Sequence, residues 1–144
     1  MVLDQAFGKI FGRAMIAAGI GCKRGAPARD IEAAIRGALA RAQIDAGALD
    51  VIATMETKSA EPGIRAVAKT FGVSLIVVPA PELAAAGDRV ETRSERVSAL
   101  AGVGSVAEAA ALAAAGPASK LIAPRLIVRA ATCALAASTP ETAP

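Results

Sequence analysis

Residues 14–25 read AMIAAGIGCKRG, an apolar run that breaks into a glycine-rich turn carrying two cations, Lys23 and Arg24. Ala14–Ile20 has the pattern of a buried strand, and an amphipathic helical pattern begins soon afterwards at Pro27. In α/β proteins, a strand, a glycine turn and a helix in this order present backbone N–H groups to an anion. Glycine suits the turn because it has no Cβ to keep a ligand away from the backbone. The stretch therefore predicts the start of an α/β fold with an anion-binding turn.

The first predicted helix is amphipathic. It begins at Pro27, where the missing N–H does no harm, and it fades before Gly47. On its polar face Glu32 and Arg36 are one turn apart and can form an ion pair. Its apolar face carries residues at helical spacing, namely Ile31, Ile35, Ala38, Leu39 and Ala42.

The strand–helix unit then recurs. A second strand is expected at Val51–Thr54, a second helix over about 60–71, and a third strand at Val73–Val78. Ser59 is the expected N-cap of this helix, and Gly72 is expected to end it. The order β-α-β-α-β is typical of a parallel sheet with right-handed crossovers.

The second half of the chain predicts a helix and a hairpin. The charged segment 88–96 is expected to form a surface loop, with a short helix after it. The sequence Ser105-Val106-Ala107-Glu108 is a capping box, which predicts a helix that ends near Ala115. Lys120–Val128 and Ala131–Ala136 predict two antiparallel strands at one edge of the sheet, where Pro124 is tolerated.

Together these elements predict a single α/β domain over residues 1–137. Its expected architecture has three layers: a mostly parallel sheet of about five strands, helices on both faces, and a C-terminal antiparallel hairpin. Residues 1–12 are expected to form a loose arm, and residues 138–144 a disordered tail.

The composition excludes several kinds of active site. Without a single histidine, the chain cannot assemble a Ser-His-Asp triad, a Cys-His pair or a His-containing zinc site. Cys22 and Cys133 lie far apart, which argues against a disulfide scaffold or iron–sulfur ligation and fits a reducing compartment. Aromatic residues make up only 2%, so binding of nucleic acid by base stacking is not expected. We expect neither a metal nor a cofactor.

Charge and hydropathy predict a cytoplasmic protein without a membrane span. The net charge of +3 comes from sixteen basic and thirteen acidic residues spread along the chain, which favours an ordinary solvated surface over nucleic-acid binding. The alanine-rich stretch Val103–Gly116 is interrupted by Glu108 and is too short to cross a bilayer.

Three loops follow the predicted parallel strands and are therefore expected at one edge of the sheet. Ligands of such folds bind at this edge, beyond the carboxyl ends of the strands. They would bring cations and helix N-termini to one crevice, which predicts a polycarboxylate or phosphate as ligand. Each residue also has a structural alternative: a turn glycine, a solvated lysine, a buried cysteine or a helix-end glutamate. Lys58 and Glu82 are the candidate acid/base groups. The candidate ligand-binding residues are Gly19, Gly21, Cys22, Lys23, Arg24, Thr54, Lys58, Ser105 and Thr132.

Several short motifs, taken in their order and spacing, resemble the CobE/CbiG C-terminal family of cobalamin (vitamin B12) biosynthesis. The resemblance runs from about residue 14 to 137. Its motifs are residues 19–25 (GIGCKRG), Ala53-Thr54 with Lys58 and Glu61-Pro62-Gly63, Pro79 with Glu82-Leu83, residues 104–112 (GSVAEAAAL) and residues 131–134 (ATCA). Many relatives carry a lysine late in the chain; the nearest residue here is Arg125, which keeps the charge but not the nucleophilicity.

The resemblance implies a compact α/β domain that binds or helps to process a corrin or precorrin intermediate, in the oxygen-dependent branch of the pathway. Larger relatives open a ring lactone of the precursor, so a lactone-opening hydrolase that uses Lys58 or Glu82 is the alternative. A phosphate- or nucleotide-binding module is a third reading, disfavoured by the incomplete glycine pattern. The implied partners are the corrin intermediate and other enzymes of the pathway, and a homodimer stays open.

Overall fold

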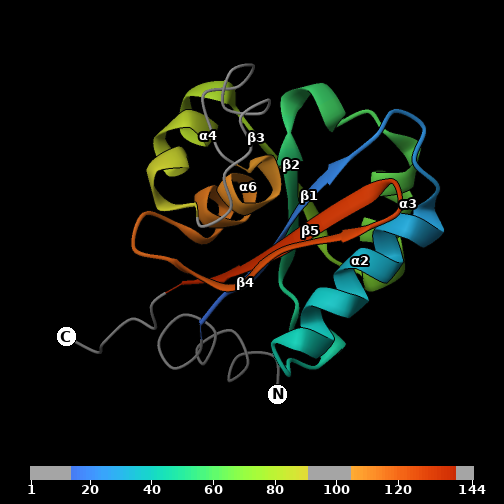
Figure 1. Cartoon of the computed structure of the whole chain (residues 1–144), viewed down its shortest axis with the longest axis horizontal. Coiled ribbons are helices and arrows are strands. Elements are labelled where there is room, and N and C mark those ends of the chain that lie inside the picture. The colour runs from blue at the N-terminus through green and yellow to red at the C-terminus, as the bar shows by residue number, and fades with distance from the viewer. Residues whose placement is uncertain (1–13, 91–104, 139–144) are drawn as a thin grey trace.

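A computed structural model of the chain describes residues 14–90 and 105–138. It contains one five-stranded sheet in the order β3-β2-β1-β5-β4 (Figure 1). The first three strands are mutually parallel, β5 is antiparallel to β1, and the edge strand β4 is antiparallel to β5. This confirms the predicted α/β sheet of five strands with a C-terminal antiparallel hairpin, although the sheet is mixed and its pairing is parallel only among the first three strands. The strands are β1 Ile16–Cys22, β2 Val51–Met55, β3 Ser74–Val78, β4 Lys120–Val128 and β5 Ala131–Ala137.

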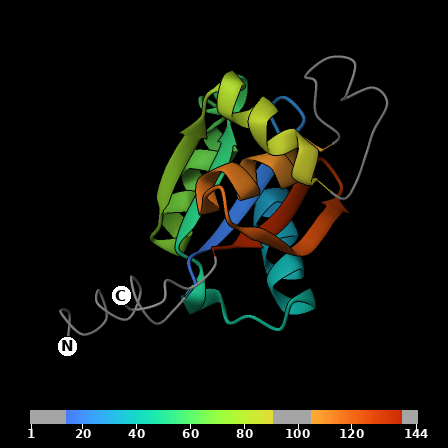
Figure 2. The same ribbon diagram turned by 90° about the vertical axis from the view of Figure 1, so that its left-hand side faces the viewer.

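Helices cover both faces of the sheet (Figures 1 and 2). Helices α2 (Ala28–Arg41) and α3 (Pro62–Phe71) pack on one face, and α4 (Ala80–Ala86) and α6 (Val106–Ala115) pack on the other. Because successive side chains of a strand point to opposite faces, β1 supplies both cores. Ala18 and Ile20 belong to the core on the α2–α3 face, and Ala17 belongs to the core on the α4–α6 face. Three 3-10 helices complete the described elements: η1 Ala46–Ala48, η2 Glu56–Lys58 and η3 Gly87–Arg89.

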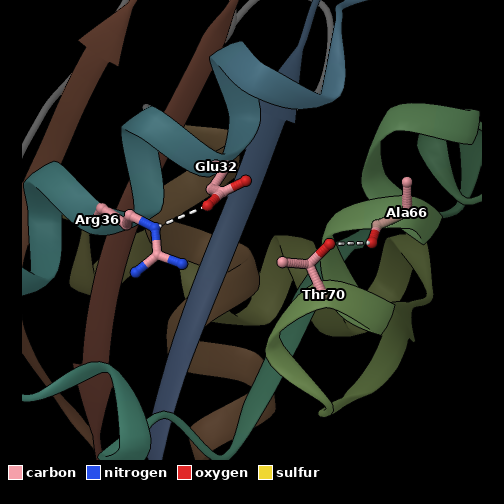
Figure 3. Close-up of polar contacts among 4 residues, drawn as sticks. All are labelled: Glu32, Arg36, Ala66 and Thr70. Atoms are coloured by element: carbon pink, nitrogen blue, oxygen red, sulfur yellow. Dashed lines mark hydrogen bonds and ion pairs between the residues drawn. The ribbon is translucent and has the colours of Figure 1, made fainter.

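Side-chain contacts join α2 and α3 on their outer surface. Arg36 donates from Nε to Glu32 Oε2 over 2.8 Å, which confirms the predicted pair (Figure 3). The same guanidinium lies 4.9 Å from the ring centre of Phe71 at the end of α3, a cation–π contact between the two helices. Within α3, the Thr70 hydroxyl donates to the Ala66 carbonyl one turn earlier (Figure 3).

The helix ends follow the predicted signals with one exception. Gly72 ends α3 in the left-handed conformation (φ 69°), as expected. Ser105 caps α6, since its Oγ accepts a hydrogen bond from the Glu108 N–H. Ser59 does not cap α3: the turn η2 intervenes, Glu61 occupies the N-cap position, and the Ser59 hydroxyl donates to the Glu56 carbonyl.

In the hairpin, β4 is an edge strand of the sheet and β5 is an interior strand. The β4–β5 register shifts between Leu121 and Ala123 and again between Ala123 and Leu126, so the irregularity brackets Pro124. Ser138 continues the pairing by one residue, because its N–H donates to the Met15 carbonyl. Ser138, the first residue of the predicted tail, therefore pairs with the sheet. The remainder of that tail, the N-terminal arm and the short helix expected after Arg96 lie outside the described residues.

Candidate binding site at the carboxyl edge of the sheet

The strand directions bring four loops to one edge of the sheet. Because β1, β2 and β3 are parallel, the segments that follow them leave at their common carboxyl edge. The β4–β5 turn, residues 129–130, lies at the same edge, since Ala131 pairs with Cys22 at the end of β1. Lys23 and Lys58 therefore follow adjacent strands at the same edge.

Backbone N–H groups of the glycine turn after β1 form hydrogen bonds within the protein. Lys23 N–H donates to the Ala130 carbonyl over 2.9 Å, and Gly25 N–H donates to Glu61 Oε1 over 2.9 Å. Ala26 N–H donates to the Lys23 carbonyl. These N–H groups are already used within the protein, so the turn does not offer them to an anion as the sequence suggested. Its contribution is a fixed backbone from which the exposed side chains of Lys23 and Arg24 extend.

Lys58 is half-buried in η2 and lies near Cys22. Burial raises the pKa of the Cys22 thiol; the Lys58 charge opposes this effect and the Glu61 charge adds to it. The net shift is upward, so the helix terminus and neighbouring cations do not make Cys22 a reactive thiolate at neutral pH. The structure thus favours the structural reading of this cysteine.

Most acidic groups at this edge already have partners. Glu61 accepts from Gly25 N–H, and Glu56 Oε1 accepts from Ala80 N–H at the start of α4, over 3.2 Å. Among the described residues, no carboxylate forms an ion pair with Lys23, Arg24 or Lys58. The edge therefore presents three cationic groups that an anionic ligand can pair with.

Three predicted ligand-binding residues are instead internal. Gly19 lies under α6, where a Cβ would come within 2.0 Å of the Ala107 carbonyl oxygen, so its role is close helix–strand packing. Thr54 is fully buried and its hydroxyl donates to the Ile20 carbonyl over 3.0 Å, which joins β2 to β1. Ser105 is buried as the N-cap of α6. Their side chains face protein rather than solvent.

Gly21 and Thr132 lie in a different environment from Gly19. They pair across β1 and β5, and Thr132 pairs with Ile127 across β5 and β4, so the three residues form one row on the α6 side of the sheet. A Cβ built on Gly21 meets no described atom within 4 Å. Ile127 is 58% exposed, an unusual position for isoleucine. We call Gly21, Thr132 and Ile127 the open row.

Glu82 and Arg125 occupy other surroundings. Glu82 is exposed on α4 and borders a pocket of about 360 Å³ between α4 and the end of α6, together with Arg89 and Pro117. Glu82 and Lys58 form no ion pair, and none of the cations at the carboxyl edge lines that pocket. Arg125 is half-buried in β4, and its N–H donates to Glu108 Oε2 over 2.8 Å.

Two residues at this edge were not singled out from the sequence, Ile127 and Arg129. Alternation along β4 could have identified Ile127 only if the bulge at Pro124 were known, because a bulge changes which residues share a face. Arg129 sits in the hairpin turn and carried no motif. Within residues 14–90 and 105–138, no group of three His, Cys, Asp or Glu side chains is placed to hold a metal ion. None of the helices in these residues has the length and hydropathy to cross a membrane.

Comparison with known proteins identifies the family. The family model for the Cobalamin synthesis G C-terminus matches residues 16–136. Protein CobE from Sinorhizobium sp is 38% identical over 118 residues, which are 82% of this chain and 77% of that protein. The crystal structure of CobE, a protein from the cobalamin (vitamin B12) biosynthetic pathway, matches with a TM-score of 0.80 and 29% identity over 89% of this chain and 93% of that one.

A second solved structure agrees. Cobalamin biosynthesis protein chiG from Agrobacterium tumefaciens matches with a TM-score of 0.69 and 33% identity, covering 90% of this chain and 100% of that one. The chain therefore belongs to the Cobalamin synthesis G C-terminus family, and its relatives support a role in cobalamin biosynthesis.

Proposed function

We propose that the chain binds a corrin or precorrin intermediate of cobalamin biosynthesis at the carboxyl edge of its sheet. The names of its relatives support the pathway. The observation that carries the proposed site is the set of cations Lys23, Arg24 and Lys58, which form no ion pair within the described residues and lie at the same edge of the sheet as the open row.

The chemistry of the ligand fits both parts of this surface. Corrin precursors are flat macrocycles whose acetate and propionate arms end in carboxylates. Lysine and arginine form charge-assisted hydrogen bonds with carboxylates, and these are stronger than neutral ones. Gly21 offers an area without a side chain and Ile127 an exposed apolar side chain, which suit the face of the macrocycle.

Binding is tested by titrating the protein with dicyanocobyrinic acid, a corrin whose side chains end in free carboxylates. The readouts are a shift of the visible absorption bands and isothermal titration calorimetry. Dicyanocobinamide, whose side chains end in amides, is the matched ligand because it keeps the macrocycle and removes the negative charges. We expect the acid to bind more tightly than the amide, and equal binding would contradict an electrostatic site.

Removing the two lysines tests where the ligand binds. Exposed or half-buried ion pairs contribute about 0.5–1 kcal/mol each, so Lys23→Ala with Lys58→Ala should weaken binding about five- to thirtyfold. The difference should grow at low salt, where charges are less screened. Arg41→Ala with Lys120→Ala is the control: it removes two exposed cations from the end of α2 and the start of β4, at the opposite edge of the sheet. An equal loss in both double variants would place the site elsewhere.

The lactone-opening alternative is separable from binding. Among the described residues, Lys58 and Glu82 form no ion pair, and Glu82 borders the pocket between α4 and α6 instead. Their positions therefore do not support a shared acid/base role. Binding of a lactone-containing precorrin without conversion supports a carrier. Turnover of many equivalents of the lactone per protein that is lost in Lys58→Ala would make the chain a hydrolase.

A further inference from the structure

The turn between β4 and β5 contains an arginine in a backbone conformation that arginine rarely adopts. Arg129 has φ 53°, in the left-handed region, and Gln43 (φ 58°) is the other non-glycine residue with positive φ among the described residues. Two-residue hairpin turns prefer glycine, asparagine or aspartate at such positions, because a side chain with Cβ is strained there. The fold itself would be served better by glycine at position 129.

The Arg129 side chain faces solvent and forms a long ion pair with one buried carboxylate. Its Nη1 lies 3.7 Å from Oδ1 of Asp30 in the first turn of α2, and the side chain is 74% exposed. Asp30 is only 4% exposed, and its Oδ1 accepts no hydrogen bond in the described part of the chain. An ion pair of this length orients the guanidinium while its donors stay available, since a guanidinium has five N–H groups.

The turn is also attached to the proposed site. Ala130, the residue after Arg129, accepts the Lys23 N–H through its carbonyl. Ala131 follows directly and pairs with Cys22, so the arginine belongs to the same edge as Lys23 and Arg24. On these grounds we infer that Arg129 is a further carboxylate-binding residue of the corrin site, and that Asp30 is its positioning residue. This inference rests on the proposed function.

Replacement by glycine separates a binding role from a structural one. Arg129→Gly removes the guanidinium and relieves the backbone, so we expect the affinity for dicyanocobyrinic acid to fall about three- to tenfold while the melting temperature stays equal or rises. Gln43→Gly is the matched control, because it relieves the same conformation in an exposed residue just beyond α2, at the other edge of the sheet. It should leave affinity unchanged. Arg129→Lys should keep part of the affinity.

The positioning role of Asp30 is tested by coupling. Asp30→Asn should weaken binding when Arg129 is present and add little in the Arg129→Gly background, because the carboxylate acts through the guanidinium. Equal effects of Asp30→Asn in both backgrounds would refute the positioning role.

The outcomes distinguish the two proposals. Absence of binding by the wild-type chain would end the proposed function. If the wild type binds and the lysine double variant is weakened, unchanged affinity in Arg129→Gly would refute the inference alone. A lower melting temperature together with weaker binding in Arg129→Gly would also refute it, since Arg129 would then serve the fold.

Discussion

Replacing Gly19 by alanine tests how tightly α6 packs on the sheet. A methyl group at this position would lie 2.0 Å from the Ala107 carbonyl oxygen and 2.6 Å from the Ala111 nitrogen. Real Cβ contacts essentially never fall below 3.0 Å, so the backbone of α6 must move by about 1 Å, the difference between 3.0 and 2.0 Å. Neither obstructing atom can rotate away, because both belong to the helix backbone.

The movement affects most of the fold, since α6 packs on β1, β2 and β5. Overpacking a core typically destabilises a protein by about 1–3 kcal/mol, and we expect Gly19→Ala to reach the upper end of that range. For a chain of this size, about 3 kcal/mol corresponds to a fall of roughly 6–12 °C in melting temperature.

The assay is urea and thermal unfolding followed by far-ultraviolet circular dichroism. Gly21→Ala is the matched control: Gly21 lies two residues further along β1 on the same face, and a Cβ there meets no described atom within 4 Å. This variant should unfold like the wild type, or at slightly higher urea. Equal stability of the two variants would refute the packing that we assign to Gly19.

Two other predictions concern groups away from the cations. Ser105→Ala removes the acceptor for the Glu108 N–H and should destabilise the protein by about 1 kcal/mol, whereas Ser105→Thr should restore most of this in the same thermal melt; an unchanged melting temperature in the alanine variant would contradict the cap. Burial raises the pKa of the Cys133 thiol above its ordinary value of 9.0, so the thiol stays protonated when folded and ionises when unfolded. The contribution of this thiol to the free energy of unfolding is therefore fully present below pH 9. Above pH 9 it declines by up to about 1.4 kcal/mol per pH unit. Urea titrations between about pH 8.5 and 10.5, the range in which the unfolded thiol ionises, should show a shallower decline in Cys133→Ala, and identical slopes would count against the buried thiol.

The strands were predictable because their apolar runs are continuous and end at turn residues. Val73–Val78 differs from the observed β3 by a single residue, and the alanine-rich helix after Ser105 was indicated by its capping box. Helix α3 begins at Pro62, two residues later than predicted. The reason is that Ser59 ends the turn η2, where its hydroxyl donates to the Glu56 carbonyl and so does not cap the helix. Local patterns thus define elements better than they define their first residues.

The roles of individual site residues depended on contacts far apart in the sequence. A glycine in a strand can admit a ligand or a helix, and only the position of α6 over Gly19 distinguishes it from Gly21. The role of Thr54 also depended on a distant contact, because its hydroxyl donates to a carbonyl of another strand. The edge cations were accessible to sequence reasoning, since loops after parallel strands meet at one edge. The position of Arg129 at this edge was not accessible to that reasoning, because Arg129 follows no strand of the β-α-β-α-β unit and lies in the turn of the antiparallel hairpin.

The most direct measurement is a titration of ¹⁵N-labelled protein with dicyanocobyrinic acid, followed by amide chemical shifts. Our account predicts that the largest changes occur at Gly21, Lys23, Lys58 and Arg129, and that dicyanocobinamide produces smaller ones. Changes centred instead on Ala85, Arg89 and Gly116, around the pocket between α4 and α6, would contradict it.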